Sequence, residues 1–284
     1  MESCRTRMEI NKYLKQMFKV IKIIIGVVLI FWLFLVVAFR PSHERDWEIG
    51  QENLPKIEAN EKEITIDNFR NFNWKEGGEV DKNYETRKFQ LDQLEDIDIF
   101  ISHFDDFEGM AHIFLSFGFS DGEQVVVSAE TRREQDEDFS PVLGLARQFE
   151  FLYVVGSEKD IIGLRTDLRD ERVYLYPSTV APETAQKIFL EIAKDVNKIH
   201  EKPRMYNTLT RNCTNELTRK VEKVSDANFP LTWKTVLPGY FDEVLFEMNL
   251  LETDVSFKET KKRSLINNQS VNRHDENFEE SLRK

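Results

Sequence analysis

The sequence AHIFLSFGFSDGEQVVVSAET, residues 111–131, decides the fold class. It contains two apolar runs, residues 111–119 and 124–131, which are separated by the polar residues 120–123 (SDGE). A Ser-Asp-Gly turn between two apolar runs predicts a β-hairpin. The sequence therefore contains at least one antiparallel strand pair, and the other elements are expected to pack around it.

Apolar spacing predicts further strands and helices on both sides of this hairpin. The predicted strands are residues 63–74, 151–156 and 172–176, and the predicted helices are residues 91–101, 182–202 and 214–224. Strands and helices in this mixed order predict an α+β fold with an antiparallel sheet.

Composition excludes several classes of protein. The chain has 284 residues, is 40% hydrophobic and 12% aromatic, and contains only 2 Cys, so it is neither a disordered protein nor a disulfide or Cys-rich zinc module. Its net charge of -12 argues against nucleic-acid binding, which needs a basic surface. No metal-binding or phosphate-binding motif occurs, so we expect no cofactor and no metal.

Residues 23–39 (IIIGVVLIFWLFLVVAF) form an uncharged apolar run of 17 residues. A membrane-spanning helix needs about 17–25 such residues. A buried core helix would show a polar face, and this run has none. A cleaved signal peptide would have a shorter apolar region, although Val36-Val37-Ala38 resembles a weak cleavage site. We therefore expect an uncleaved signal anchor.

The flanking charges predict the orientation of this anchor. Six basic residues precede the run, whereas the three that follow it are interleaved with acidic residues: the six are Arg5, Arg7, Lys12, Lys15, Lys19 and Lys22. By the positive-inside rule the N-terminus is cytoplasmic and the body is exported. The arm before the run carries a net charge of +4, which leaves -16 for the rest of the chain.

These patterns divide the chain into five segments. They are a cytoplasmic basic arm (1–22), a transmembrane signal anchor (23–39), a stalk (40–62), an exported domain (63–252) and a disordered polar tail (253–284). The stalk is polar and punctuated by proline, and the tail has too few apolar residues to form a core.

Cys213 is the candidate nucleophile. It lies at the start of the helix predicted at 214–224, with Asn212 as the N-cap. The helix dipole and the free N–H groups of the first turn stabilise a thiolate and an oxyanion. Cys4 lies on the other side of the membrane, so Cys213 is a lone thiol in an oxidising compartment. The alternative is a buried, inert thiol.

A thiolate nucleophile needs a histidine as its base. His43 lies in the stalk, His274 in the tail, and His200 at a helix end where a structural role fits better. His103 and His112 remain. We favour His112 because a strand holds it in place, whereas His103 is expected in a loop. The alternative for His112 is a core histidine with a satisfied hydrogen bond.

Glu130 is the candidate for the third catalytic residue. Ser128, Glu130 and Arg132 share one face of the second hairpin strand, which the turn brings beside His112. A carboxylate there can accept a hydrogen bond from the imidazole and fix its tautomer. The alternative is a surface Glu–Arg pair.

Six ordered blocks resemble the Lnb N-terminal periplasmic domain family over roughly residues 46–224. The blocks are NFRNFNW (68–74), AHIFLSFGF (111–119), SAETRRE (128–134), FLYVVGSEKDIIGLR (151–165), RVYLYP (172–177) and YNTLTRNCTNEL (206–217). The resemblance implies a circularly permuted papain-like fold, with Cys213 as nucleophile and His112 as base. It also implies a bacterial inner-membrane protein with a periplasmic body.

The members that give the family its name are lipoprotein N-acyltransferases, in which a membrane region follows this domain. Here the membrane-spanning run precedes the domain instead. Three functions therefore stay open: a thiol acyltransferase acting on a lipid or lipoprotein, a thiol hydrolase acting on a peptide or cell-wall amide, and a non-catalytic binding module.

Overall fold

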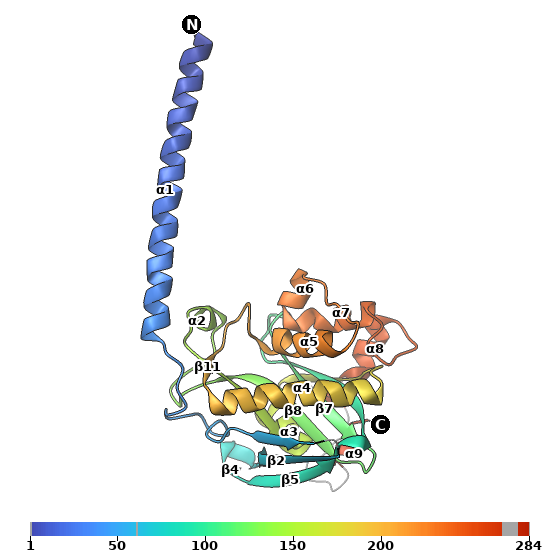
Figure 1. Cartoon of the computed structure of the whole chain (residues 1–284). Helices are drawn as coiled ribbons and strands as arrows, with labels where there is room; N and C mark the ends of the chain where they lie inside the picture. The colour runs from blue at the N-terminus through green and yellow to red at the C-terminus, as the bar shows by residue number, and fades with distance from the viewer. Residues whose placement is uncertain (1, 61, 269–277, 284) are drawn as a thin grey trace.

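A long N-terminal helix projects from a mixed α/β body (Figure 1). The computed structural model describes residues 2–60, 62–268 and 278–283. Helix α1 (Glu2–Ala38) contains a stretch, Lys12–Ala38, with a mean hydropathy of 3.1 over its most apolar window. Within the described residues this is the one helix that is long and apolar enough to cross a membrane. This finding agrees with the expected anchor.

The body is built on a nine-stranded sheet whose central path is β1-β2-β9-β8-β7-β6-β10. Its strands are β1 (Lys56–Ala59), β2 (Glu63–Arg70), β5 (Tyr84–Gln90), β6 (Leu94–His103), β7 (Ala111–Phe119), β8 (Gln124–Arg132), β9 (Glu150–Gly156), β10 (Arg172–Pro177) and β11 (Arg204–Met205). Pairing is antiparallel except for one parallel contact between β2 and β9. The α+β class is thereby confirmed.

The predicted hairpin is confirmed as β7 and β8. The two strands pair from Gly118–Gln124 to Phe114–Ser128. The Gly122 N–H donates to the carbonyl of Phe119 in the turn, and Gly122 has a φ of 89°. Glycine reaches that backbone region at no steric cost, which explains the Ser-Asp-Gly sequence.

Helices cover the two faces of the sheet unequally. One face packs against α4 (Pro182–Glu201), α5 (Cys213–Val224) and α7 (Phe241–Glu247), and it carries the larger hydrophobic core. The other face packs against α3 (Glu158–Gly163) and a smaller core. We call these the α5 face and the α3 face. The predicted helices at 182–202 and 214–224 are confirmed.

The helix predicted at residues 91–101 is wrong. A 3₁₀ turn (Leu91–Gln93) leads directly into β6. Ile97, Ile99 and Ile101 lie on the α5 face, whereas the intervening Phe100 lies on the α3 face. Both faces of this strand are buried, so its apolar positions fit helical spacing and strand alternation equally well.

The segment expected to be a stalk is instead part of the body. Strand β1 pairs with β2, and Trp47 is buried. The Ser42 N–H donates to the Glu150 carboxylate over 3.0 Å. These long-range contacts hold the segment against the sheet, because its apolar and charged residues have partners there. The prediction of a stalk rested on polarity and proline content, which do not reveal such partners.

The segment expected to be a disordered tail is folded in its described parts. Helix α8 (Phe257–Ser264) packs near β10, and α9 (Phe278–Ser281) buries Phe278 against the α3 face. Arg283 pairs with the buried Glu158 and Asp98. Few apolar residues suffice here because buried carboxylates of the sheet supply the partners. Residues 269–277 lie outside the described residues.

Candidate functional site

Cys213 is the first residue of α5, as the sequence predicts. Asn212 caps the helix: its side-chain oxygen accepts from the Asn215 N–H over 2.8 Å, and its amide donates to the Thr208 carbonyl over 2.7 Å. The cap fixes the point at which the helix begins. It thereby holds the thiol at the positive end of the helix dipole.

Cys213 is 6% exposed and belongs to the main hydrophobic core. Burial raises its pKa above the ordinary value of 9.0, and hydrogen bonding opposes this effect. The opposing groups include the backbone N–H of Ile113 and groups of Thr214. Ile113 lies just beyond the last paired residues of β7 and β8, so its N–H faces the thiol where the two strands part.

His112 and Cys213 lie on opposite faces of the sheet. Side chains alternate along β7, so Ala111 and Ile113 point to the α5 face, where Cys213 also lies. His112 points to the α3 face together with Phe114, and the two rings stack at 5.9 Å. The structure therefore does not bring the predicted nucleophile and its predicted base together.

The structure does bring His112 and Glu130 together, in a polar cluster on the α3 face. His112 Nε2 lies 2.7 Å from Ser128 Oγ, and Ser128 donates to Glu130 Oε1 over 2.8 Å. Arg165, from the turn Leu164–Leu168, donates to the same carboxylate oxygen over 2.9 Å. We call His112, Ser128, Glu130 and Arg165 the His112 cluster.

Charge in the His112 cluster resides on Glu130 and Arg165. Burial, reinforced by the Arg165 guanidinium, lowers the pKa of His112 to about 3. Burial would raise the pKa of Glu130, but the charge of Arg165, together with Arg70 and the hydrogen bond from Ser128, outweighs it and lowers that pKa. His112 is therefore neutral at ordinary pH. Because Ser128 donates its proton to Glu130, we assign the imidazole proton to Nε2, which donates to Ser128.

His103 lies on the same face of the sheet as Cys213. It ends β6 directly opposite Ala111, and its ring meets Tyr174 edge-on at 5.5 Å on the α5 face. Its side chain is fully buried and neither ring nitrogen has a hydrogen-bond partner in the part of the chain that the structure describes. Burial lowers its pKa, and Glu108 Oε1, 3.9 Å from Nδ1, opposes this.

Two of these neighbours, Arg165 and Glu108, were not predicted from the sequence as site residues. Arg165 reaches Glu130 from 35 positions away, and Glu108 lies in the loop that joins β6 to β7. Arg165 is the last residue of the family-like block 151–165, but neither its pairing with Glu130 nor the approach of Glu108 to His103 follows from sequence spacing. Within the described residues, no group of three or more His, Cys, Asp or Glu side chains is arranged to hold a metal ion.

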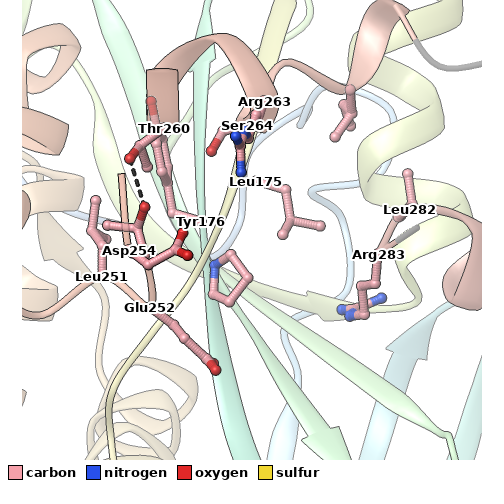
Figure 2. Close-up of a pocket in the computed structure, with 13 residues that line it drawn as sticks. Leu175, Tyr176, Leu251, Glu252, Asp254, Thr260, Arg263, Ser264, Leu282 and Arg283 are labelled. Carbon is pink, nitrogen blue, oxygen red and sulfur yellow. Dashed lines mark hydrogen bonds between the residues drawn. The ribbon is translucent and has the colours of Figure 1, made fainter. Parts of the chain in front are cut away.

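Two cavities of the body lie away from these residues. A cavity of about 250 Å³ is lined by β10 and the C-terminal segment, including Tyr176, Thr260 and Arg283 (Figure 2). A second, of about 450 Å³, lies between the beginning of α4 and the end of α5, near Val221. Neither is lined by Cys213, His103 or the His112 cluster.

Residues 80–239 match the Lnb N-terminal periplasmic domain family, and the chain belongs to this family. The matched region contains β5 to β10, α4, α5 and Cys213. With α1, this membership indicates a single-pass membrane protein with a periplasmic domain. Comparison with curated proteins and with solved structures gave no match.

Proposed function

We propose that this protein is a membrane-anchored periplasmic thiol enzyme in which Cys213 is the nucleophile. The observation that supports this most directly is the position of the thiol. It lies at the capped start of α5, in reach of the Ile113 N–H and of the first-turn N–H groups. Such donors stabilise both a thiolate and the oxyanion formed when a thiolate attacks a carbonyl.

The reaction we propose is acyl transfer from a lipid. Cys213 Sγ attacks the ester carbonyl, the S–C bond forms as the C–O bond breaks, and the alcohol leaves with the thiol proton. An amine or hydroxyl acceptor, such as the amino terminus of a lipoprotein, then attacks the thioester. The acyl group leaves sulfur and the proton of the acceptor returns to Cys213. A hydrolase would use water in this second step.

The thiol needs a base, because burial keeps it protonated at rest. His112, with a pKa of about 3, is a poor acceptor for a proton from a thiol whose pKa exceeds 9.0. We therefore propose His103 as the base and Glu108 as its orienting carboxylate. His112 and Glu130 remain the prediction from the sequence, and both assignments are tested below.

One observation favours a second candidate function, a non-catalytic binding module. Cys213 and His112, the histidine predicted from the sequence to be the base, lie on opposite faces of the sheet, and burial raises the pKa of the thiol. A module of this kind would retain the fold and the anchor without forming a covalent intermediate.

Mass spectrometry of the intact protein separates the three functions. The full chain, purified in detergent, is incubated with bacterial membrane extract before its mass is measured. A fatty-acyl adduct on Cys213 is expected, since an acyl-thioester is the obligatory intermediate of the transferase. The adduct should persist in Cys4→Ser and disappear in Cys213→Ser, because only one cysteine is proposed to react.

Other results would contradict the proposal in distinct ways. A peptidyl adduct on Cys213 would identify a hydrolase or transpeptidase instead. The absence of any adduct, together with unchanged function of Cys213→Ala in cells, would identify the binding module.

A further inference from the structure

The junction between α1 and the body is very short. Helix α1 ends at Ala38, and Ser42 is already hydrogen-bonded to Glu150. Arg45 then pairs with Glu134 and Glu150. Three residues, Phe39, Arg40 and Pro41, lie between Ala38 and Ser42, so the four steps from one Cα atom to the next span at most about 14 Å when fully extended. The part of the body that surrounds this junction therefore stays beside any bilayer that holds α1.

Exposed apolar side chains gather on three segments of the body. They lie on α2 (Pro141–Leu145), on the loop 207–211 and on α6 (Trp233–Val236). We call them the apolar rim: Val142 (71% exposed), Leu143 (44%), Leu145 (44%), Leu209 (57%), Trp233 (59%) and Val236 (42%). Large apolar residues exposed to this extent on neighbouring segments mark an interaction surface.

Contacts between the segments show that the apolar rim is continuous with the junction. Glu134 and Glu150, the partners of Arg45, flank α2 in the sequence. The Thr208 hydroxyl donates to the Pro141 carbonyl over 2.7 Å, which joins α2 to the loop 207–211. In Figure 1, α2 and α6 both lie on the side of the body from which α1 projects.

The β6–β7 loop completes this side of the body. Phe104 meets Phe139, two residues before α2, with ring centroids 6.0 Å apart. At its other end the loop carbonyl of Gly109 accepts from the Gly239 N–H, beside α6. The loop therefore links the α2 part of the apolar rim to the α6 part.

We propose that the apolar rim rests on the bilayer that holds α1, so that the body has a second membrane contact. The short junction brings this side of the molecule to the membrane surface. Tryptophan and branched aliphatic side chains on short helices suit the interfacial region of a bilayer. The chain beyond the basic arm is strongly acidic, so electrostatic attraction to anionic lipids does not replace this apolar contact.

The proposed contact gives Cys213 a route to lipid. The loop 207–211 carries Leu209 on the apolar rim and leads through Asn212 directly to Cys213. A lipid acyl chain at the bilayer surface would therefore approach the capped start of α5. This inference rests on the membrane insertion of α1 that the proposed function assumes, and it does not depend on the chemistry of Cys213.

Tryptophan fluorescence tests the docking in the full chain. The chain has 4 Trp; Trp47 and Trp74 are buried, whereas Trp32 lies in α1 and Trp233 on the apolar rim. Trp32→Phe is reconstituted in phosphatidylethanolamine–phosphatidylglycerol vesicles with acyl chains brominated near the headgroup. We expect bromine to quench the fluorescence of Trp233. We also expect the emission of Trp233 to shift to the blue relative to the same protein in detergent solution.

Matched variants separate docking from anchoring. Trp233→Phe, which retains Trp32, reports whether α1 is inserted. In Trp32→Phe/Trp233→Phe/Gln90→Trp the reporter moves to an exposed position on β5, at the other end of the body from α6 (Figure 1). We expect this protein to show only the residual quenching of Trp47 and Trp74.

Two results would overturn the inference. In the first, Trp32 is quenched but Trp233 is quenched no more than the Gln90→Trp reporter. That result would show that the anchor is inserted and that the body is not docked. The other is a blue shift of Trp233 that increases with protein-to-lipid ratio and occurs without bromine quenching. That result would assign the apolar rim to contact between copies of the chain.

Discussion

At Cys213, burial and hydrogen bonding act in opposite directions on the same thiol. Burial dominates and raises the pKa, while the Ile113 N–H stabilises the thiolate. An ordinary helix N-terminus contributes about 0.3–1 kcal/mol to thiolate stability, which is less than one pKa unit. The protonation state of Cys213 therefore depends on whether a histidine can accept its proton. The identity of that histidine, His103 or His112, decides the pKa of the thiol.

Alkylation of Cys213 by iodoacetamide against pH distinguishes the two histidines. In the full chain carrying Cys4→Ser, we expect His103→Gln to raise the apparent pKa of alkylation by about one or more. When His103 accepts the thiol proton, the imidazolium that forms stabilises the thiolate, and losing that stabilisation costs at least about 1.4 kcal/mol, or one pKa unit. His112→Gln and Glu130→Gln should shift the profile less, because both residues lie on the other face of the sheet.

The opposite order of effects would restore the assignment made from the sequence. If His112→Gln raises the apparent pKa and His103→Gln leaves it unchanged, His112 is the base. Glu130→Gln should then produce an intermediate shift, since Glu130 would act by orienting His112.

At the level of single residues, the sequence predicted which side chains of the hairpin lie close together. It did not predict which residues lie on opposite faces of the sheet. The hairpin turn fixed the register, so the proximity of His112, Ser128 and Glu130 followed from residues 111–131 alone. The separation of His112 from Cys213 could not be predicted from these residues. It depends on which face α5 covers, and that is decided by core packing between segments about 100 positions apart.

The elements that carry local signals were predictable, because their ends are defined by nearby residues. Helix α5 begins where the cap residue Asn212 and the position of Cys213 predicted it. Strand β6 was predicted as a helix because both of its faces are buried. The C-terminal elements were missed because they are stabilised by distant charged partners, as Arg283 shows.

Loss of the Asn212 cap should loosen the first turn of α5. In Asn212→Ala the Asn215 N–H and the Thr208 carbonyl both lose a partner, with an expected cost of about 1 kcal/mol or slightly more. This predicts roughly five-fold faster hydrogen exchange in the first turn of α5. Asn212→Ser is the matched control, since a hydroxyl can still cap the helix and should restore most of the protection.

The outcome that contradicts this prediction is equal exchange in Asn212→Ala and the unsubstituted chain. The start of α5 would then be held by packing of Leu217 and Cys213 alone.

For the molecule as a whole, Arg283 joins the C-terminal segment to the sheet. It lies 2.7 Å from Asp98 and also pairs with Glu158, whose side chain is fully buried. Burial raises the pKa of Asp98 to about 6, although Arg283 acts in the other direction. Removing one partner of a buried ion pair leaves an uncompensated charge and typically costs about 3–5 kcal/mol.

Arg283→Gln should therefore lower the free energy of unfolding by about 3–5 kcal/mol near pH 8. The loss should be smaller at pH 5. Because the folded-state pKa of Asp98 is raised above its unfolded value, the folded state binds the proton more tightly, and stability falls as pH rises through about 6. Guanidinium titrations followed by the fluorescence of the buried Trp47 and Trp74 measure both values.

Arg263→Gln provides the matched control for this experiment. Arg263 is 62% exposed and pairs with Glu259 within α8, so its loss should cost no more than about 0.5 kcal/mol at either pH. Equal effects of the two substitutions, or a larger effect of Arg283→Gln at pH 5 than at pH 8, would show that the buried pair does not hold the C-terminal segment.

The short junction after α1 also determines how the protein would encounter its substrates. A body held within about 14 Å of its anchor samples a thin layer above the bilayer and diffuses laterally with α1. Its search is then two-dimensional, and the lipids beneath it are present at the high effective concentration that a short tether creates. A weak intrinsic affinity for lipid would therefore be sufficient, whereas a dilute soluble substrate would gain nothing from the tether.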